Sequence, residues 1–128
     1  MLLLQLLMTE LIACLGAGKG TWNEVARLIA SESWSNIFLV TNDFGKENFA
    51  QKFPTVKAAF VVVDDFVPPL QLVEIIKKAL EGKIADTEVA VNMASGAGNV
   101  HMALITALLR LGLGIRFVVP SEVGAKEL

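Results

Sequence analysis

Short apolar runs alternate with longer amphipathic segments along almost the whole of this chain. Five runs have the length and apolar content of buried strands, and they span 11–15, 36–41, 58–63, 87–92 and 115–119. The segments between them repeat apolar residues at three- and four-residue spacing, which indicates helices over 21–30, 45–53, 68–81 and 100–111. Such alternation is typical of parallel strands that are joined by helical crossovers.

The direction of these crossovers restricts the topology further. Crossovers between parallel strands are right-handed. When some of them run toward one edge of the sheet and the others toward the opposite edge, their helices cover both faces. We therefore predict a Rossmann-like, doubly wound α/β fold with a mainly parallel sheet of five or six strands. The expected strand order is 3-2-1-4-5.

Local signals set the ends and faces of the expected helices. Thr21 and Glu24 have the spacing of a capping box, with Thr21 as the N-cap. Pro68 and Pro69 suit the first turn of the third helix, and Gly82 closes it. The expected inward-facing residues of the third and fourth helices are Leu72, Ile75, Ile76, Leu80, Met102, Ile105, Leu108 and Leu109.

The hydrophobic content of 54% fits a sheet that is buried on both faces. A membrane span is the rival explanation, but the longest apolar stretch, 101–120, is interrupted by Arg110 and Arg116. The leucine-rich start has no basic residue before it and ends at Glu10, unlike a secretory signal. We expect one domain over 1–128, with 1–8 as an N-terminal extension, in the cytoplasm and away from membranes.

Cysteine content and charge exclude several classes of protein. Cys14 is the only cysteine, which excludes an internal disulfide and a cysteine-based zinc site. The net charge is −2 and no lysine or arginine cluster occurs, so the electrostatic footprint of a duplex DNA binder is missing. We expect no duplex DNA partner, no metal and no cofactor.

A glycine-rich turn, 16–21, follows the first strand. Its glycines let backbone N–H groups approach a phosphate, and the next helix adds its positive end. The string Gly16-Ala17-Gly18-Lys19-Gly20-Thr21 is similar to the GAGKGT core of adenylate-kinase-like P-loops. Ala13, however, stands where that loop begins with glycine, and only three arginines are present for a phosphoryl-clamping lid. An anion-binding turn is favoured over a kinase, and the hypothesis that the glycines serve only a tight junction stays open.

A second glycine-rich turn, 95–99, follows the fourth strand. In the order 3-2-1-4-5 the chain reverses direction between strands 1 and 4. Ligands of open α/β sheets bind at such a switch point, beyond the carboxyl ends of the strands. The two turns are therefore expected to form one site for an anionic, nucleotide-like ligand.

The segment from Val89 to Ala103 resembles the strand-4 motif of CRISPR-associated Rossmann-fold (CARF) sensor domains, and the resemblance extends from about Glu10 to Val119. The family pattern is an apolar strand, Asn or Asp, any residue, Ser or Thr, Gly-Gly-Thr and a basic residue. The resemblance implies a side-by-side homodimer that binds cyclic oligoadenylate across its two-fold axis in antiviral signalling. Some family members are ring nucleases, which cleave that ligand without a metal.

The chain departs from the family pattern in two places. Ser95-Gly96-Ala97-Gly98 stands where Gly-Gly-Thr and a basic residue are usual, so either Lys19 supplies the charge or the ligand differs. No winged-helix or nuclease segment follows the fifth strand, which implies a stand-alone sensor, a ring nuclease or a diverged relative with an unknown output effector. Two competing hypotheses stay open, namely a mononucleotide- or dinucleotide-binding enzyme and a ligand-free scaffold.

The candidate site residues follow from the two turns and the ends of the strands. Lys19 and His101 are the candidate catalytic residues, and no metal ligand is expected. Asp64 and Asp65 end strand 3 away from the switch point and are expected to form a turn, while Trp22 and Trp34 are expected in the core or an interface. The expected ligand-binding residues are Gly16, Ala17, Gly18, Lys19, Gly20, Thr21, Thr41, Asn42, Asn92, Ala94, Ser95, Gly96, Ala97, Gly98, Asn99 and His101.

Overall fold

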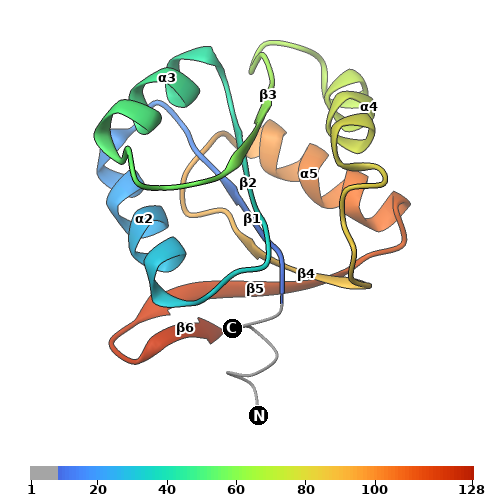
Figure 1. Ribbon diagram of the computed structural model, residues 1–128. Helices are drawn as coiled ribbons and strands as arrows, with labels where there is room; N and C mark the ends of the chain where they lie inside the picture. The colour runs from blue at the N-terminus through green and yellow to red at the C-terminus, as the bar shows by residue number, and fades with distance from the viewer. Residues whose placement is uncertain (1–8) are drawn as a thin grey trace.

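The computed structural model describes residues 9–128 (Figure 1), so the expected N-terminal extension, 1–8, lies outside the described residues. One six-stranded sheet runs in the order β3-β2-β1-β4-β5-β6. Its strands are β1 (Leu11–Cys14), β2 (Ile37–Thr41), β3 (Ala59–Val62), β4 (Glu88–Asn92), β5 (Gly114–Ser121) and β6 (Gly124–Glu127). The first five are parallel and β6 is antiparallel to β5, which confirms the predicted α/β class and strand order.

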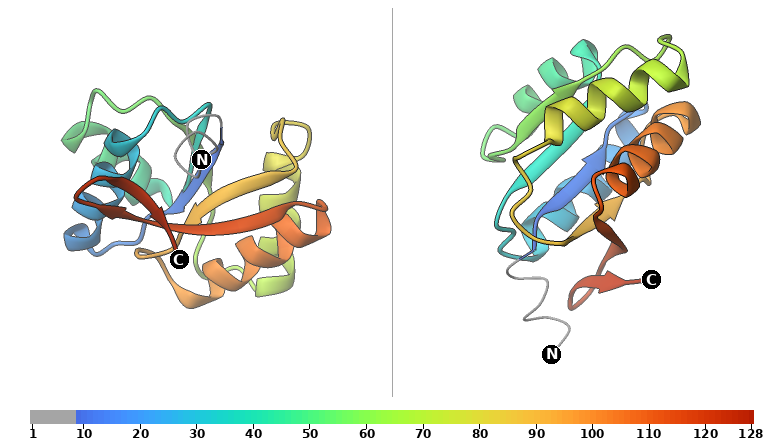
Figure 2. Two further views of the ribbon diagram at one scale, coloured as in Figure 1. Left: turned by 90° about the horizontal axis from the view of Figure 1, so that it is seen from below. Right: turned by 90° about the vertical axis from the view of Figure 1, so that its right-hand side faces the viewer.

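Helices cover both faces of the sheet (Figure 2). They are α2 (Trp22–Ser31), α3 (Asp43–Lys52), α4 (Pro69–Leu80) and α5 (Gly98–Arg110), with a 3-10 turn, η1 (Lys19–Thr21), before α2. Side chains of β1 alternate between two hydrophobic clusters: Leu11 and Ala13 pack with α2 and α3, whereas Ile12 and Cys14 pack with α4 and α5. The central strand is therefore apolar at every position, as the hydrophobic content indicates.

The register of the central strands aligns the ends that carry the two turns. Ala13 of β1 pairs with Asn92, the last residue of β4, and Cys14 pairs with Val40 of β2. The chain therefore leaves β1, β2 and β4 at the same edge of the sheet.

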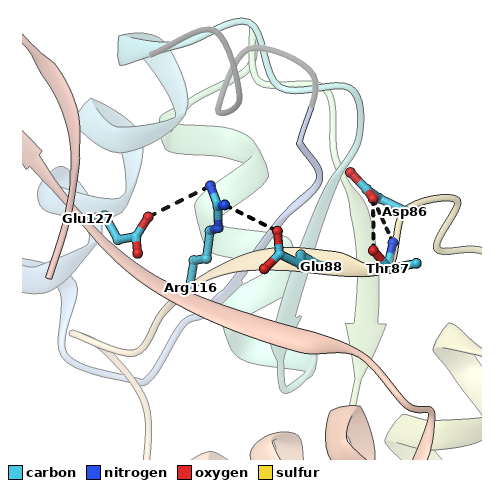
Figure 3. Close-up of polar contacts among 5 residues, drawn as sticks. All are labelled: Asp86, Thr87, Glu88, Arg116 and Glu127. Carbon is cyan, nitrogen blue, oxygen red and sulfur yellow. Dashed lines mark hydrogen bonds and ion pairs between the residues drawn. The ribbon is translucent and has the colours of Figure 1, made fainter. Parts of the chain in front are cut away.

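The far edge of the sheet is closed by a hairpin that the sequence analysis does not anticipate. β5 continues through Pro120 and ends at Ser121. A two-residue turn follows, and β6 begins at Gly124, whose φ is +114°. Arg116 joins three strands here (Figure 3): its guanidinium lies 3.2 Å from a Glu88 carboxylate oxygen on β4 and 3.8 Å from one of Glu127 on β6. This cluster lies toward the amino end of β4, away from the turns.

Two expectations about the helices are wrong. Thr21 makes no side-chain cap to α2, because the preceding 3-10 turn puts it in a helical conformation and its hydroxyl donates to the Gly18 carbonyl instead. Ile75, Met102 and Leu109 are exposed rather than inward-facing. Helix α5 is apolar around most of its circumference, so its periodicity does not select a face, and its buried residues are Val100, Ala103, Leu104, Ala107 and Leu108.

No helix within residues 9–128 has both the length and the apolar content to cross a membrane.

Candidate functional site

The two glycine-rich turns touch each other directly at the carboxyl end of the sheet. The Gly16 N–H donates to the Ser95 hydroxyl at 2.8 Å. A Cβ atom on Gly16 would lie 2.8 Å from the Gly96 nitrogen and 2.9 Å from its Cα, distances that side chains do not adopt. The first turn therefore requires glycine at position 16.

The second turn is also supported from behind by His101. Gly96 has a φ of +104°, and His101 Nε2 lies 2.7 Å from the Ser95 carbonyl oxygen. Because a carbonyl oxygen only accepts, Nε2 carries the proton and donates it. The histidine ring therefore fixes the shape of the turn and lies outside the lining of the cavity described next.

A cavity of about 400 Å³ lies between the two turns. Eight of its nine lining residues are expected site residues, and the ninth is Asp65. The eight are Gly16, Ala17, Gly18, Thr21, Ala94, Ser95, Gly96 and Ala97. The structure therefore brings the two turns together at one cavity, and their role as a ligand site stays a prediction.

Two helical segments begin at the cavity. Gly18 is the N-cap of η1, which leads directly into α2, and Ala97 is the N-cap of α5; neither N-terminus has a side-chain cap. The first N–H groups of a helix point back along its axis and carry its partial positive charge. The cavity therefore offers backbone donors from two directions.

Trp22 anchors the first turn. Trp22 is the first residue of α2; its indole is fully buried, and Nε1–H donates to the Gly16 carbonyl at 2.8 Å. The expectation of a core position is confirmed for Trp22, whereas Trp34 is half-buried and donates to the Leu28 carbonyl at 3.0 Å. The indole of Trp22 thus fixes the residue that contacts the second turn.

Other expected site residues have structural partners instead. Thr41 is buried and its hydroxyl donates to the Leu15 carbonyl at 3.0 Å. Asn92 is also buried; it donates to the Val118 carbonyl and accepts the Ala94 N–H, so it holds the base of the second turn. Neither residue lines the cavity.

Lys19 does not lie in the cavity either. Its ammonium lies 5.6 Å from the centre of the Phe44 ring, over the start of α3. Among the nine lining residues, the only formal charge is therefore the carboxylate of Asp65. None of the nine lining side chains contributes a positive charge.

Asp65 is the site residue that the sequence analysis misses. Its carboxylate accepts a hydrogen bond from Asn42 Nδ2 at 3.1 Å, and its carbonyl accepts one from Asn99 Nδ2 at 2.7 Å. The expectation that Asp64 and Asp65 lie away from the switch point is wrong for Asp65. Asp64 does form the expected turn, because its carboxylate accepts the Phe66 N–H.

Cys14 lies directly beneath the second turn. Burial away from water raises the pKa of its thiol to about 12, so the thiol is neutral at physiological pH. A Cβ atom on Gly96 would lie 3.1 Å from the Cys14 Cβ. Cys14 thus acts as an apolar support for the turn.

Within residues 9–128, no three histidine, cysteine, aspartate or glutamate side chains are grouped so that they could hold a metal ion. No protein-family model matches the chain, and no curated protein is significantly similar to it.

Proposed function

We propose that this protein is a CARF-like nucleotide-sensing domain that binds cyclic oligoadenylate, or a related nucleotide, across a homodimer interface in CRISPR-linked antiviral signalling in the cytoplasm. The observation that carries the proposal is the direct contact between Gly16 and the Ser95-Gly96 turn beside one cavity. Both turns are thereby held in position before any ligand arrives, which lowers the entropic cost of binding.

The electrostatics of the cavity favour a phosphodiester over a more highly charged anion. Backbone N–H groups at the starts of η1 and α5 suit a phosphate oxygen. No lysine or arginine lines the cavity, and Asp65 contributes a negative charge. A phosphodiester carries one charge per phosphate, so it is repelled less than a phosphomonoester or a triphosphate.

The homodimer is supported by an exposed apolar surface on the two helices beside the cavity. Leu70 of α4 is 69% exposed, Met102 and Leu109 of α5 are 56% and 62% exposed, and Phe66 before α4 is 94% exposed. The two helices lie side by side (Figure 2). A two-fold related copy that packed on this surface would bury these apolar side chains.

The geometry of the cavity favours binding without cleavage. A ring nuclease of the proposed kind needs Lys19 or His101 at the ligand, and neither lines the cavity. An enzyme that uses a mononucleotide or dinucleotide would share the cavity. Mass spectrometry of ligand retained through purification separates the latter class from a cyclic oligoadenylate sensor.

Isothermal titration calorimetry with cyclic tetra-adenylate and cyclic hexa-adenylate tests the proposal, with the dimer checked by analytical ultracentrifugation. We expect binding with one ring per dimer. The absence of heat at high micromolar concentration, with a confirmed dimer, refutes the ligand.

One variant separates loss of the site from loss of the fold. In Ala97→Asp the new carboxylate can cap α5, which stabilises a helix by about 0.5–1.5 kcal/mol, while it occupies the N–H groups that the phosphate needs. We expect a higher melting temperature and at least about tenfold weaker binding. Thr55→Asp, which adds the same charge at an exposed turn, should leave affinity unchanged.

A further inference from the structure

Asp65 is fixed in position by residues at the starts of two helices, α3 and α5. Asn42, which caps α3 by accepting the Gly45 N–H, donates to Asp65 Oδ2. Asn99, in the first turn of α5, donates to the Asp65 carbonyl. Asp65 is therefore held beside the glycine turns by contacts that do not depend on a ligand.

The other carboxylate oxygen, Oδ1, accepts no hydrogen bond from any residue within 9–128. A carboxylate next to backbone N–H groups weakens the attraction of the site for a bare anion. The same oxygen accepts strongly from a neutral O–H or N–H. The arrangement suits a ligand that carries its phosphate and a hydrogen-bond donor side by side.

Asp65 also borders a second cavity, of about 370 Å³, at the carboxyl ends of β2 and β3. Phe44 and Phe66 line this cavity, and both rings are exposed, by 45% and 94%. Asp65 is the residue that lines both cavities, so a group that extends from the first to the second passes it. Aromatic rings there suit the flat face of a base.

We infer that Asp65 is a specificity-determining residue of this site: it accepts a hydrogen bond from a neutral donor on the nucleoside part of the ligand while the two glycine turns hold the phosphate. The donor is a ribose hydroxyl or an exocyclic amino group, which share this chemistry. The inference rests on the proposed function, and it adds recognition of the nucleoside, which the two turns alone do not provide.

The test compares wild type with Asp65→Asn. An asparagine keeps an oxygen for Asn42 Nδ2 and places an N–H₂ group where Oδ1 was, so the loop contacts are retained while the acceptor is replaced by a donor. We expect the affinity for cyclic tetra-adenylate to fall about 10- to 100-fold, the range for losing a hydrogen bond to a charged group. The melting temperature should change little.

Asp86→Asn is the matched control. It makes the same substitution at an exposed residue that lines neither cavity, so it should change affinity less than about threefold. Two altered cyclic ligands identify the donor group: cyclic tetra-deoxyadenylate lacks the ribose hydroxyl, and cyclic tetra-inosinate lacks the exocyclic amino group. If the donor is the ribose hydroxyl, wild type and Asp65→Asn should bind cyclic tetra-deoxyadenylate equally well. If the donor is the amino group, the two proteins should bind cyclic tetra-inosinate equally well.

The outcomes distinguish the two proposals. If wild type binds no cyclic oligoadenylate, the proposed function and this inference both fail. If wild type binds and Asp65→Asn binds equally well or more tightly, only the role of Asp65 is refuted. An equal loss for the adenylate, deoxyadenylate and inosinate rings also refutes it, because the carboxylate would then read no donor.

Discussion

The contact between Gly16 and Gly96 predicts that alanine at position 16 strongly destabilises the fold. The Cβ of Gly16→Ala would lie 2.8 Å from a backbone nitrogen, which cannot swing aside as a flexible side chain does. Overpacking of this kind costs about 1–3 kcal/mol. Separating the turns also lengthens the hydrogen bond from the Gly16 N–H to Ser95, which is worth about 0.5–1.5 kcal/mol. The expected loss in the free energy of unfolding is about 2–4 kcal/mol.

Gly18→Ala provides the control within the same turn. Gly18 has φ −77° and ψ 100°, which alanine adopts readily, and no heavy atom lies within 4 Å of its added Cβ. Such a replacement should be neutral or stabilise the protein by about 0.4–1 kcal/mol, because it restricts the unfolded chain.

Urea unfolding followed by circular dichroism measures both variants, and thermal unfolding provides a second readout. For a domain of this size the expected loss for Gly16→Ala corresponds to a fall of about 6–20 °C in melting temperature. If Gly16→Ala lies within about 0.5 kcal/mol of Gly18→Ala, the turns do not touch through their backbones. We would then conclude that the cavity is not preformed.

Three further predictions concern the support of the sheet. Because the pKa of Cys14 is raised in the folded protein, the unfolded chain loses its thiol proton first as pH rises above about 9, and the free energy of unfolding should fall there by up to about 1.4 kcal/mol per pH unit. In urea titrations at several pH values, Cys14→Ala should show a shallower fall than wild type, and identical slopes would contradict the burial of the thiol. Glu10→Gln should cost about 1–3 kcal/mol, since the buried carboxylate accepts the N–H groups of Ala85 and Asp86; a loss below about 0.5 kcal/mol in chemical denaturation would show that these bonds contribute little. Arg116→Ala should lower the free energy of unfolding by about 1–2 kcal/mol. Arg110→Ala removes an exposed ion pair and should lower it by less than about 0.5 kcal/mol. Equal losses would refute a special role for the Arg116 cluster in Figure 3.

The sheet and the two turns were predictable because their signals are local. Each strand is a short apolar run, and crossover handedness then leaves few possible orders. Gly16 and Gly96 mark sharp turns, and their places after β1 and β4 bring them to one edge. The short β6 was not predictable in the same way, since its four residues, Gly124–Glu127, carry no apolar run and depend on pairing with β5.

Asp65 and the exposed face of α5 were missed for different reasons. The chain that leaves β3 must cross over β2 and β1 to reach β4, so the loop after β3 runs toward the switch point. The predicted strand order could therefore have placed Asp65 near the two turns. On α5, apolar residues occupy both the buried side and the outer side, which leaves Met102 and Leu109 exposed. A helix of this kind has no periodicity that distinguishes the core from a second interface.

The glycines and the alanines of the cavity differ in how freely they can be substituted, and this difference has an evolutionary consequence. Gly16 and Gly96 form the backbone contact and admit no side chain, so the positions of the N–H groups tolerate almost no variation. Ala17, Ala94 and Ala97 line the same cavity and are exposed, and each contributes only a methyl group. Substitutions at these three positions can change the shape and charge of the cavity without moving the backbone. Under the proposed function, a lineage with this fold could therefore exchange one ligand for another through few mutations, while the backbone contact between the turns is inherited intact.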